Sequence, residues 1–296
     1  MIALLNRLLL FLQKNRWLNL VLVLAYTVFV LHGHDTFVQL SVVVMNKLSL
    51  QVYNDRVMQL MMAAAAFFLL STLYQLYRQP QRWRTKLTFL FLCFGALGLH
   101  VALLFEMNIE IIHVAEFTVL VLLLFPFSRS IGASLVYALP IMIADELNQY
   151  LVLYPNYNKY FELSDIVLDL LGAGTLFLLL HIGGLSLQKD ERPWLKKPAV
   201  VLLLTIITST TLGLLTKLFV FTPSEAESHT VFVFNRLEQP ELFWQVHSFT
   251  GAKYHVLLPY EGIALAVLIC MLFMIYERMV LTSLPQNYNS HFYGPC

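Results

Sequence analysis

The chain alternates between long apolar segments and short polar connections. Eight of these segments are long enough to cross a bilayer, because a spanning helix needs roughly 20 mainly apolar residues. Each apolar run is continuous, whereas the strands of a membrane barrel alternate between apolar and polar positions, so helices are predicted. The fold class expected is an all-α polytopic membrane helical bundle. The predicted spans are residues 17–34, 57–77, 87–106, 109–126, 130–147, 165–184, 198–221 and 259–277.

Composition agrees with this fold class and excludes several others. Of 296 residues, 58% are hydrophobic and 12% are charged, whereas ordinary soluble domains carry about 25% charged residues. The 19 Lys and Arg against 18 Asp and Glu give a net charge of +1, which leaves no basic face for nucleic acid. The three cysteines are scattered and form neither a disulfide framework nor a paired metal motif. An integral membrane protein is therefore expected.

Basic residues are concentrated in every second connection, and this sets the expected orientation. By the positive-inside rule, both termini face the cytoplasm and the intervening connections face outward. Residues 1–16 are expected to form an interfacial amphipathic helix before the first span. The expected location is the bacterial cytoplasmic membrane. The basic residues that support this topology are Arg7, Lys14, Arg16, Arg78, Arg82, Arg84, Lys86, Arg129, Lys189, Arg192, Lys196, Lys197 and Arg278.

The chain divides into three expected regions. Residues 1–86 hold the interfacial helix and two spans, residues 87–184 hold a core of four helices, and residues 185–296 hold two more spans. The long outer connection 222–258 is expected to form a small ordered cap, with a hairpin near Thr250 and Gly251. The apolar but interrupted segment 36–56 is expected to lie along the outer interface.

Acidic residues crowd into one part of the sequence. Eight of the 18 lie within 64 positions, where Arg129 and Lys159 are the only Lys or Arg. In the expected topology all eight lie at or just below the outer surface. Burying ionised carboxylates there costs a few kcal/mol each, so an outward acidic pocket with a compensating partner is predicted. The eight are Glu106, Glu110, Glu116, Asp145, Glu146, Glu162, Asp165 and Asp169.

Helical spacing gathers these residues onto common faces. Glu110, His113 and Glu116 step by three residues, while Asp145 with Gln149 and Asp165 with Asp169 are four apart. Gly172 continues the last face, where a neighbouring helix or a ligand could approach closely. Glu106 and Glu162 are expected to face water or cap a helix. His100 is expected to pack or to join the pocket, and Lys217 to reach toward the membrane surface. The group His32, His34 and Asp35 is expected to be solvated.

Several of these blocks together resemble the VanZ-like family, which is named for a teicoplanin-resistance determinant. The resemblance covers about residues 88–184 and implies a four-helix core similar to enzymes that act on phosphate-bearing lipid head groups. The family usually has an arginine in the loop after the proline, whereas here only Lys159 could supply positive charge, and the spacing of Gly172 and Gly174 is compressed. The blocks are 113–117 (HVAEF), 145–150 (DELNQY), 154–155 (YP) and 165–174 (DIVLDLLGAG).

The leading hypothesis is an enzyme that modifies or transfers the head group of a membrane lipid or polyprenyl-linked cell-envelope substrate at the outer leaflet. A divalent cation, Mg²⁺ or Ca²⁺, is expected as cofactor, and this inference rests on charge alone. His113, oriented by Glu116, is expected to act as general base or nucleophile. The expected metal ligands are Asp145, Glu146, Asp165 and Asp169. Gln149 completes the catalytic group, and the residues expected around the substrate are Asp165, Asp169, Gly172, Lys159 and Glu110.

Two other classes of function stay open at this point. A proton- or cation-coupled transporter could use the same acids, but they gather on one side, and no comparable ionisable group is expected toward the cytoplasmic half. A non-catalytic binding or assembly protein of the cell envelope would use the outer cap.

Overall fold

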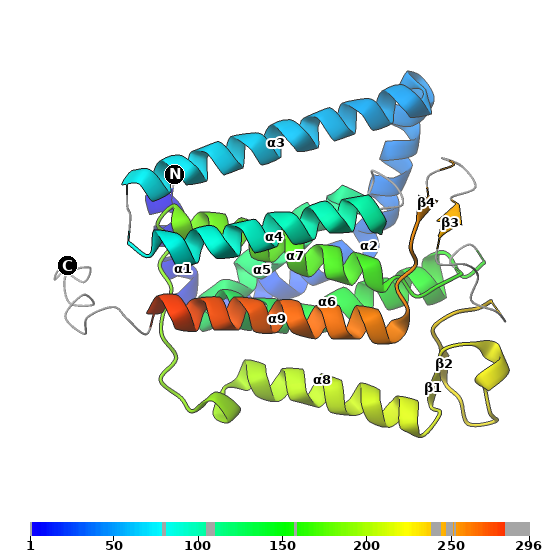
Figure 1. Ribbon diagram of the computed structural model, residues 1–296. Coiled ribbons are helices and arrows are strands. Elements are labelled where there is room, and N and C mark those ends of the chain that lie inside the picture. Colours follow the sequence, from blue (N-terminus) through cyan, green and yellow to red (C-terminus); the bar gives the residue numbers. More distant parts are fainter. Residues whose placement is uncertain are drawn as a thin grey trace.

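The computed structural model is an all-α bundle of long apolar helices, as predicted (Figure 1). It describes residues 2–78, 81–104, 110–156, 159–237, 244–246, 251 and 253–281, but not the side chains of His34, Asp35 and Phe37. Eight helices in this part of the chain are long and apolar enough to cross a membrane. They are α2 (Arg16–Leu48), α3 (Leu50–Arg78), α4 (Trp83–Leu103), α5 (Ile111–Ser128), α6 (Ile131–Asn148), α7 (Leu163–Ile182), α8 (Pro198–Leu215) and α9 (Pro259–Leu281).

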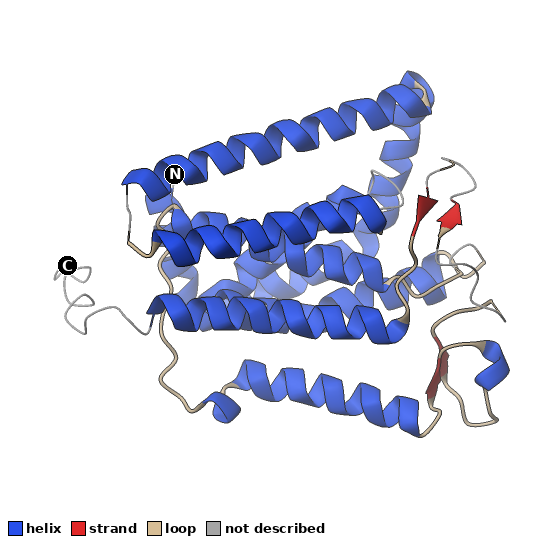
Figure 2. Ribbon diagram, viewed as in Figure 1, coloured by secondary structure: helices blue, strands red, loops and turns tan. Residues whose placement is uncertain are grey.

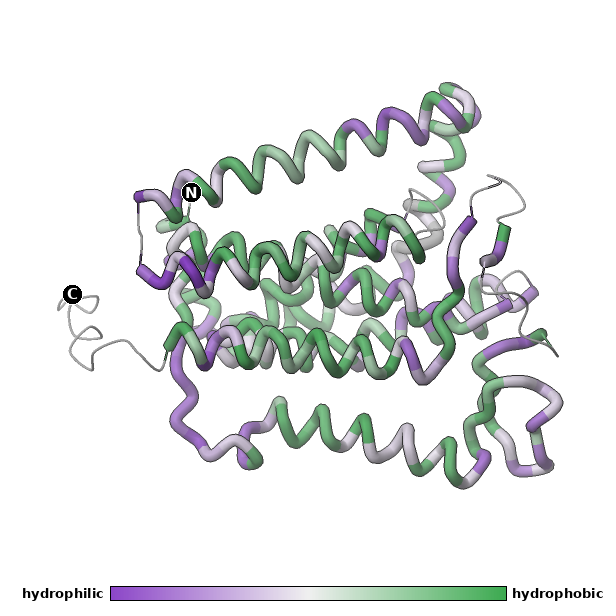
Figure 3. Tube along the Cα trace, in the orientation of Figure 1, coloured by the Kyte–Doolittle hydropathy of each residue, from purple (hydrophilic) through white to green (hydrophobic). Residues whose placement is uncertain are grey.

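The two ends of the bundle differ. One end carries α1 (Ile2–Lys14), the α5–α6 and α7–α8 connections and the end of α9, and we call it the basic end. The other end, the strand end, carries four two-residue strands (Figure 2). The helices are mainly apolar between these ends, as Figure 3 shows. Which end faces the cytoplasm stays a prediction. The strands are β1 (Phe219–Val220), β2 (Phe232–Val233), β3 (Gln245–Val246) and β4 (Lys253–Tyr254).

Helix α7 lies at the centre of the bundle. It packs against α4, α5, α6 and α9, and 83% of its spanning window is buried. Glycines allow the close approach, since a Cβ on Gly172 would lie 2.6 Å from Val114 of α5, and one on Gly174 would overlap the ring of Phe273 of α9. Two aspartates of the candidate site therefore stand on the helix most fully enclosed by protein.

Helices α3 and α8 lie at the periphery. Only 6% of the spanning window of α3 and 22% of that of α8 are buried within the chain. Large apolar side chains such as Phe67 and Leu70 are exposed on α3, and Figure 1 shows this helix standing apart from most of the bundle. These helices have the apolar surface expected of lipid-facing spans.

Within segment 36–56, α2 continues to Leu48 and α3 begins at Leu50, with a break only at Ser49, whose φ is 70°. The expectation that this segment lies along the outer interface stays a prediction. One helix boundary was predicted wrongly. The predicted span 198–221 ends as a helix at Leu215, since Lys217 adopts a left-handed φ of 56° and a strand follows. Lys217 then pairs with Glu227.

The expected cap is ordered where the structure describes it. β1 pairs with β2 in parallel, and β3 pairs with β4 antiparallel around the predicted hairpin, of which Thr250 lies outside the described residues. A bridge between Tyr160 and Asn235 fastens this region to the α6–α7 connection. Two 3₁₀ turns, Trp194–Lys196 and Pro223–Glu225, complete the connections on either side of α8.

The sequence predicted no ionisable group comparable to the clustered acids toward the cytoplasmic half, but charged residues are also buried at the basic end. Glu277 of α9 is 7% exposed, Lys86 of α4 is 9% exposed, and Arg129 in the α5–α6 turn is 2% exposed. The guanidinium of Arg129 lies 5.1 Å from the ring centroid of Phe125. These residues stand beside polar turns in the sequence, and tertiary packing buries them.

Candidate functional site

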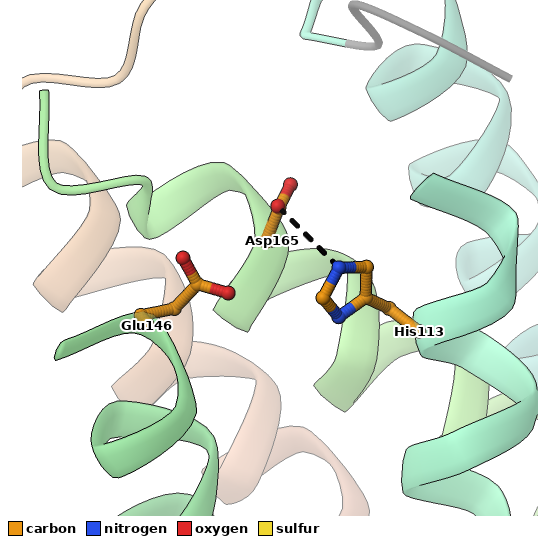
Figure 4. A group of neighbouring side chains, drawn as sticks. All are labelled: His113, Glu146 and Asp165. Carbon is orange, nitrogen blue, oxygen red and sulfur yellow. Dashed lines mark ion pairs between the residues drawn. The ribbon is translucent and has the colours of Figure 1, made fainter. Parts of the chain in front are cut away.

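Three buried side chains from three helices meet near the strand end. His113 of α5, Glu146 of α6 and Asp165 of α7 each offer a ligand atom, and these atoms all lie within 4.8 Å of one another. His113 Nε2 lies 3.9 Å from Asp165 Oδ2. Figure 4 shows the three groups pointing toward a common space. We call them the His–Glu–Asp triad.

Asp169 extends the triad one turn along α7. Its Oδ1 lies 4.0 Å from His113 Nδ1, so the imidazole ring lies between two carboxylates of the same helix. Asp169 is fully buried, and neither of its oxygens accepts a hydrogen bond from the described residues. The four-residue spacing of Asp165 and Asp169 therefore does place both toward one partner.

The side-chain amide of Gln149 donates hydrogen bonds to both acids of α6. Gln149 Nε2 donates to Asp145 Oδ2 at 3.1 Å and to Glu146 Oε1 at 3.2 Å. At Gln149 the helix changes to a π turn, Gln149–Leu153, a wider coil that often occurs at functional sites. The predicted pairing of Asp145 with Gln149 is present, and Glu146 shares it.

Glu116 does not orient His113. Its carboxylate is 4% exposed and accepts no hydrogen bond within the described part of the chain, while its backbone carbonyl accepts from Tyr26 Oη at 3.1 Å. The carboxylates that face the His113 ring nitrogens come from α7 instead. His113 stacks on Phe117, with their ring planes 3° apart. Residues three apart on a helix share a face only approximately, and here the packing of α7 decides the contact.

All but one of the other predicted residues lie in the described part of the chain. Glu110 is buried at the start of α5. Gly172 allows the close approach of α5, which is the helix-packing role expected of it rather than the ligand role. Lys159 is exposed, and its carbonyl accepts from the Arg236 backbone at 2.8 Å. Glu162 occupies the N-cap position of α7, while Glu106 lies outside the described residues. The substrate roles of these residues stay predictions.

Arg236 is a cation near the site that sequence reasoning missed. Its NH2 group donates to the Tyr150 carbonyl at 2.7 Å, and its NH1 group donates to the Pro155 carbonyl. Its guanidinium lies 3.9 Å from the centroid of the Tyr150 ring. Tyr150 adjoins Gln149, so Arg236 connects the cap to the turn that holds the acids. No local signal could reveal this contact, because 86 residues separate the two in sequence.

The donor set fits a divalent cation better than an uncompensated cluster. One imidazole nitrogen and two carboxylate oxygens converge from rigid helices, and buried carboxylates need positive charge nearby. This set differs from the expected four carboxylates, since it includes His113 and leaves Asp145 and Asp169 beside it. A mixed nitrogen and oxygen site suits Mn²⁺ or Zn²⁺ more than Ca²⁺, which prefers oxygen alone.

Comparisons with protein-family models, with curated proteins and with solved structures gave no match to this chain. The VanZ-like resemblance therefore stays a prediction from the residues that carry it.

Proposed function

We propose that the chain is a membrane-embedded, VanZ-like enzyme that hydrolyses or transfers the phosphate-bearing head group of a lipid or polyprenyl-linked cell-envelope substrate. The supporting observation is the buried His–Glu–Asp triad at one end of a bundle of membrane-length helices. In this proposal the strand end faces outward in a bacterial cytoplasmic membrane, so the site meets head groups of the outer leaflet.

His113, Glu146 and Asp165 would hold the cation, which when bound supplies charge neutralisation for phosphate oxygens. His113 is then a ligand, and the base role falls to a neighbouring carboxylate. Asp145 and Asp169 are the candidates, since each has an oxygen that accepts no hydrogen bond from the described residues. The hydroxyl of water or of an acceptor gives its proton to that carboxylate as its oxygen bonds to phosphorus. The phosphorus–oxygen bond to the leaving group then breaks. Gln149 keeps Asp145 and Glu146 oriented.

A cation-binding measurement tests the triad directly. Purified protein is titrated with Mn²⁺ by calorimetry, alongside His113→Ala, Glu146→Gln and Asp165→Asn. Each variant is expected to weaken binding at least tenfold, because each removes one protein ligand. His100→Ala is the matched control, since His100 is equally buried at 2% exposed but stands outside the triad. Equal loss in the control, or no Mn²⁺ binding by the unaltered protein, would contradict the site.

An activity measurement tests the reaction. The protein is incubated with lipid-linked and polyprenyl phosphates, with and without EDTA, and released head groups are quantified. Turnover is expected for the unaltered protein, and EDTA, His113→Ala and Asp145→Asn are expected to abolish it. No turnover under any condition, together with unchanged lipid binding by both variants, would favour the non-catalytic binding or assembly protein.

A transporter is the second candidate, and one observation favours it. Buried ionisable groups occur in both halves of the bundle, with Glu116 and Asp169 toward the strand end and Glu277 and Lys86 toward the basic end. Intramembrane charges of this kind commonly mark ion paths. Cation or proton flux in proteoliposomes that disappears in Glu116→Gln would support transport over catalysis.

A further inference from the structure

A cavity lies at the basic end, across the bundle from the triad. It has a volume of about 520 Å³ and lies among the α5–α6 turn, the α7–α8 connection, the first turn of α8 and the end of α9. It shares no residue with the His–Glu–Asp triad. A ligand bound in this cavity would therefore not contact the residues of the proposed metal site.

The lining of this cavity is apolar toward the spans and charged toward the connections. Phe127, Val200 and Met274 belong to membrane-length helices, whereas Lys189, Arg192 and Lys197 belong to the α7–α8 connection. Trp194 and Tyr137 also line it. Tyrosine and tryptophan favour the zone between lipid tails and water. A ligand that fills this cavity must be amphiphilic.

The carboxylates of the lining already have partners. Asp190 accepts from Arg192 Nε at 2.9 Å and NH2 at 2.8 Å, and these hydrogen bonds lower the pKa of the Asp190 carboxyl. Glu191 pairs with Lys189 at 3.1 Å. Glu277 accepts from Ser130 Oγ at 2.6 Å and from the Ile131 backbone. The acids of the cavity are thus engaged within the protein.

Lys197 is a cation of the cavity lining. It is half-buried and lines the cavity. It forms no ion pair within 4.0 Å among the described residues, although its charge also acts on Asp190 and Glu277 of the same lining. Its Nζ lies 6.0 Å from the ring centroid of Trp194. It also occupies the N-cap position of α8, where the helix dipole adds positive potential. Two sources of positive charge therefore converge beside an apolar wall.

We propose that this cavity binds an anionic phospholipid, with its phosphate at Lys197 and the start of α8 and its acyl chains against the apolar wall of α6, α8 and α9. Phosphate oxygens accept hydrogen bonds from an ammonium group and from helix amides, which in α8 begin after Pro198 because proline has no amide hydrogen. The polar connection above the wall excludes a purely apolar ligand. In a membrane, such a lipid fixes the peripheral helix α8 against α6.

Native mass spectrometry of the full chain tests this proposal. The protein in detergent is titrated with short-chain phosphatidylglycerol or with phosphatidylcholine of the same chain length. One phosphatidylglycerol is expected to bind at least tenfold tighter than phosphatidylcholine. Lys197→Glu is expected to remove this preference by reversing the charge at the phosphate. Lys196→Glu makes the same charge change one residue away, outside the cavity lining, and is expected to retain it.

A second variant tests the role of the apolar wall of the cavity. Ala133→Phe fills space beside the cavity wall without altering charge, and it is expected to weaken binding of both lipids. Equal loss in Lys196→Glu and Lys197→Glu would overturn the proposal in favour of general surface charge. Equal affinity for the two lipids, displacement by inorganic phosphate alone, or unchanged binding in Ala133→Phe would also overturn it. None of these readouts depends on metal binding or turnover at the triad.

Discussion

Buried carboxylates at the two ends of the bundle have opposite surroundings. At the basic end, Glu277 accepts from the Ile131 backbone and from Ser130 Oγ, and so caps α6 from the neighbouring helix α9. At the strand end, Glu116 and Asp169 are equally buried but accept no hydrogen bonds from the described residues. Burial alone therefore does not identify a functional acid. A carboxylate engaged by backbone amides supports the fold, whereas one without such partners is placed for a ligand.

The sharpest test of this contrast is Glu277→Ala. Removing a buried acceptor leaves the first amide of α6 without its partner, so a loss of about 3 kcal/mol in the free energy of unfolding is expected. Unfolding of the detergent-solubilised protein by a denaturing detergent, followed by circular dichroism, measures it. Glu277→Gln retains an acceptor and is expected to lose less. An unchanged unfolding free energy in both variants would remove the distinction between the ends.

Gly132→Ala tests the packing that positions Glu277. A Cβ on Gly132 would lie 2.5 Å from Met274 Cγ and 2.8 Å from the Met274 backbone nitrogen, so α6 and α9 must separate. A loss of about 2 kcal/mol in the free energy of unfolding is expected from this overpacking. Gly95→Ala is the control, because nothing lies within 4 Å of its Cβ position. Equal melting temperatures for the two variants would show that α9 does not need this close approach.

Arg236→Gln tests how the strand end holds its acids in place. The substitution removes two hydrogen bonds to carbonyls and the stacking on Tyr150, so a loss of about 1–2 kcal/mol is expected. Faster hydrogen exchange of the backbone amides in Gln149–Leu153 is expected to report this loss of stability. Lys159→Gln removes an exposed charge nearby and is expected to leave exchange unchanged. Equal exchange in both variants would show that Arg236 does not support the π turn.

Glu116→Gln is expected to have the smallest effect on stability. The carboxylate has no hydrogen bonds within the described chain to lose, so the free energy of unfolding is expected to stay within about 0.5 kcal/mol. The same unfolding assay used for Glu277→Ala measures it. A loss comparable to that of Glu277→Ala would mean that both acids are structural, and the comparison of the two ends would fail.

Local periodicity predicted much of the fold and part of the site. Continuous apolar runs are a property of each segment alone, so each predicted span corresponds to a helix. Four-residue spacing likewise placed Asp165 and Asp169 on one face, and the structure brings both to His113. The end of α8 was predicted wrongly for a local reason, since Lys217 adopts a positive φ at a position that carries no glycine.

The partners of each side chain could not be predicted in the same way. Whether His113 faces Glu116 or α7 depends on how helices rotate against one another, and no spacing within α5 encodes that rotation. Arg236 and Glu277 meet their partners across 86 and 146 residues. Contacts over such separations follow from tertiary packing, which a single sequence does not display.

The central position of α7 has a consequence for assembly in the membrane. An aspartate at the centre of a spanning helix disfavours insertion by about 3 kcal/mol. Helix α7 carries Asp169 beyond its first turn and Asp165 within its first turn, where the cost is smaller. Three of the four helices that enclose it, α4, α5 and α6, precede it in the chain, and α9 follows. During synthesis α7 can therefore enter a groove that already presents His113 and Gln149, and the arrival of α9 closes it. The order of the helices along the chain thus lowers the cost of placing the acids of the site within the membrane.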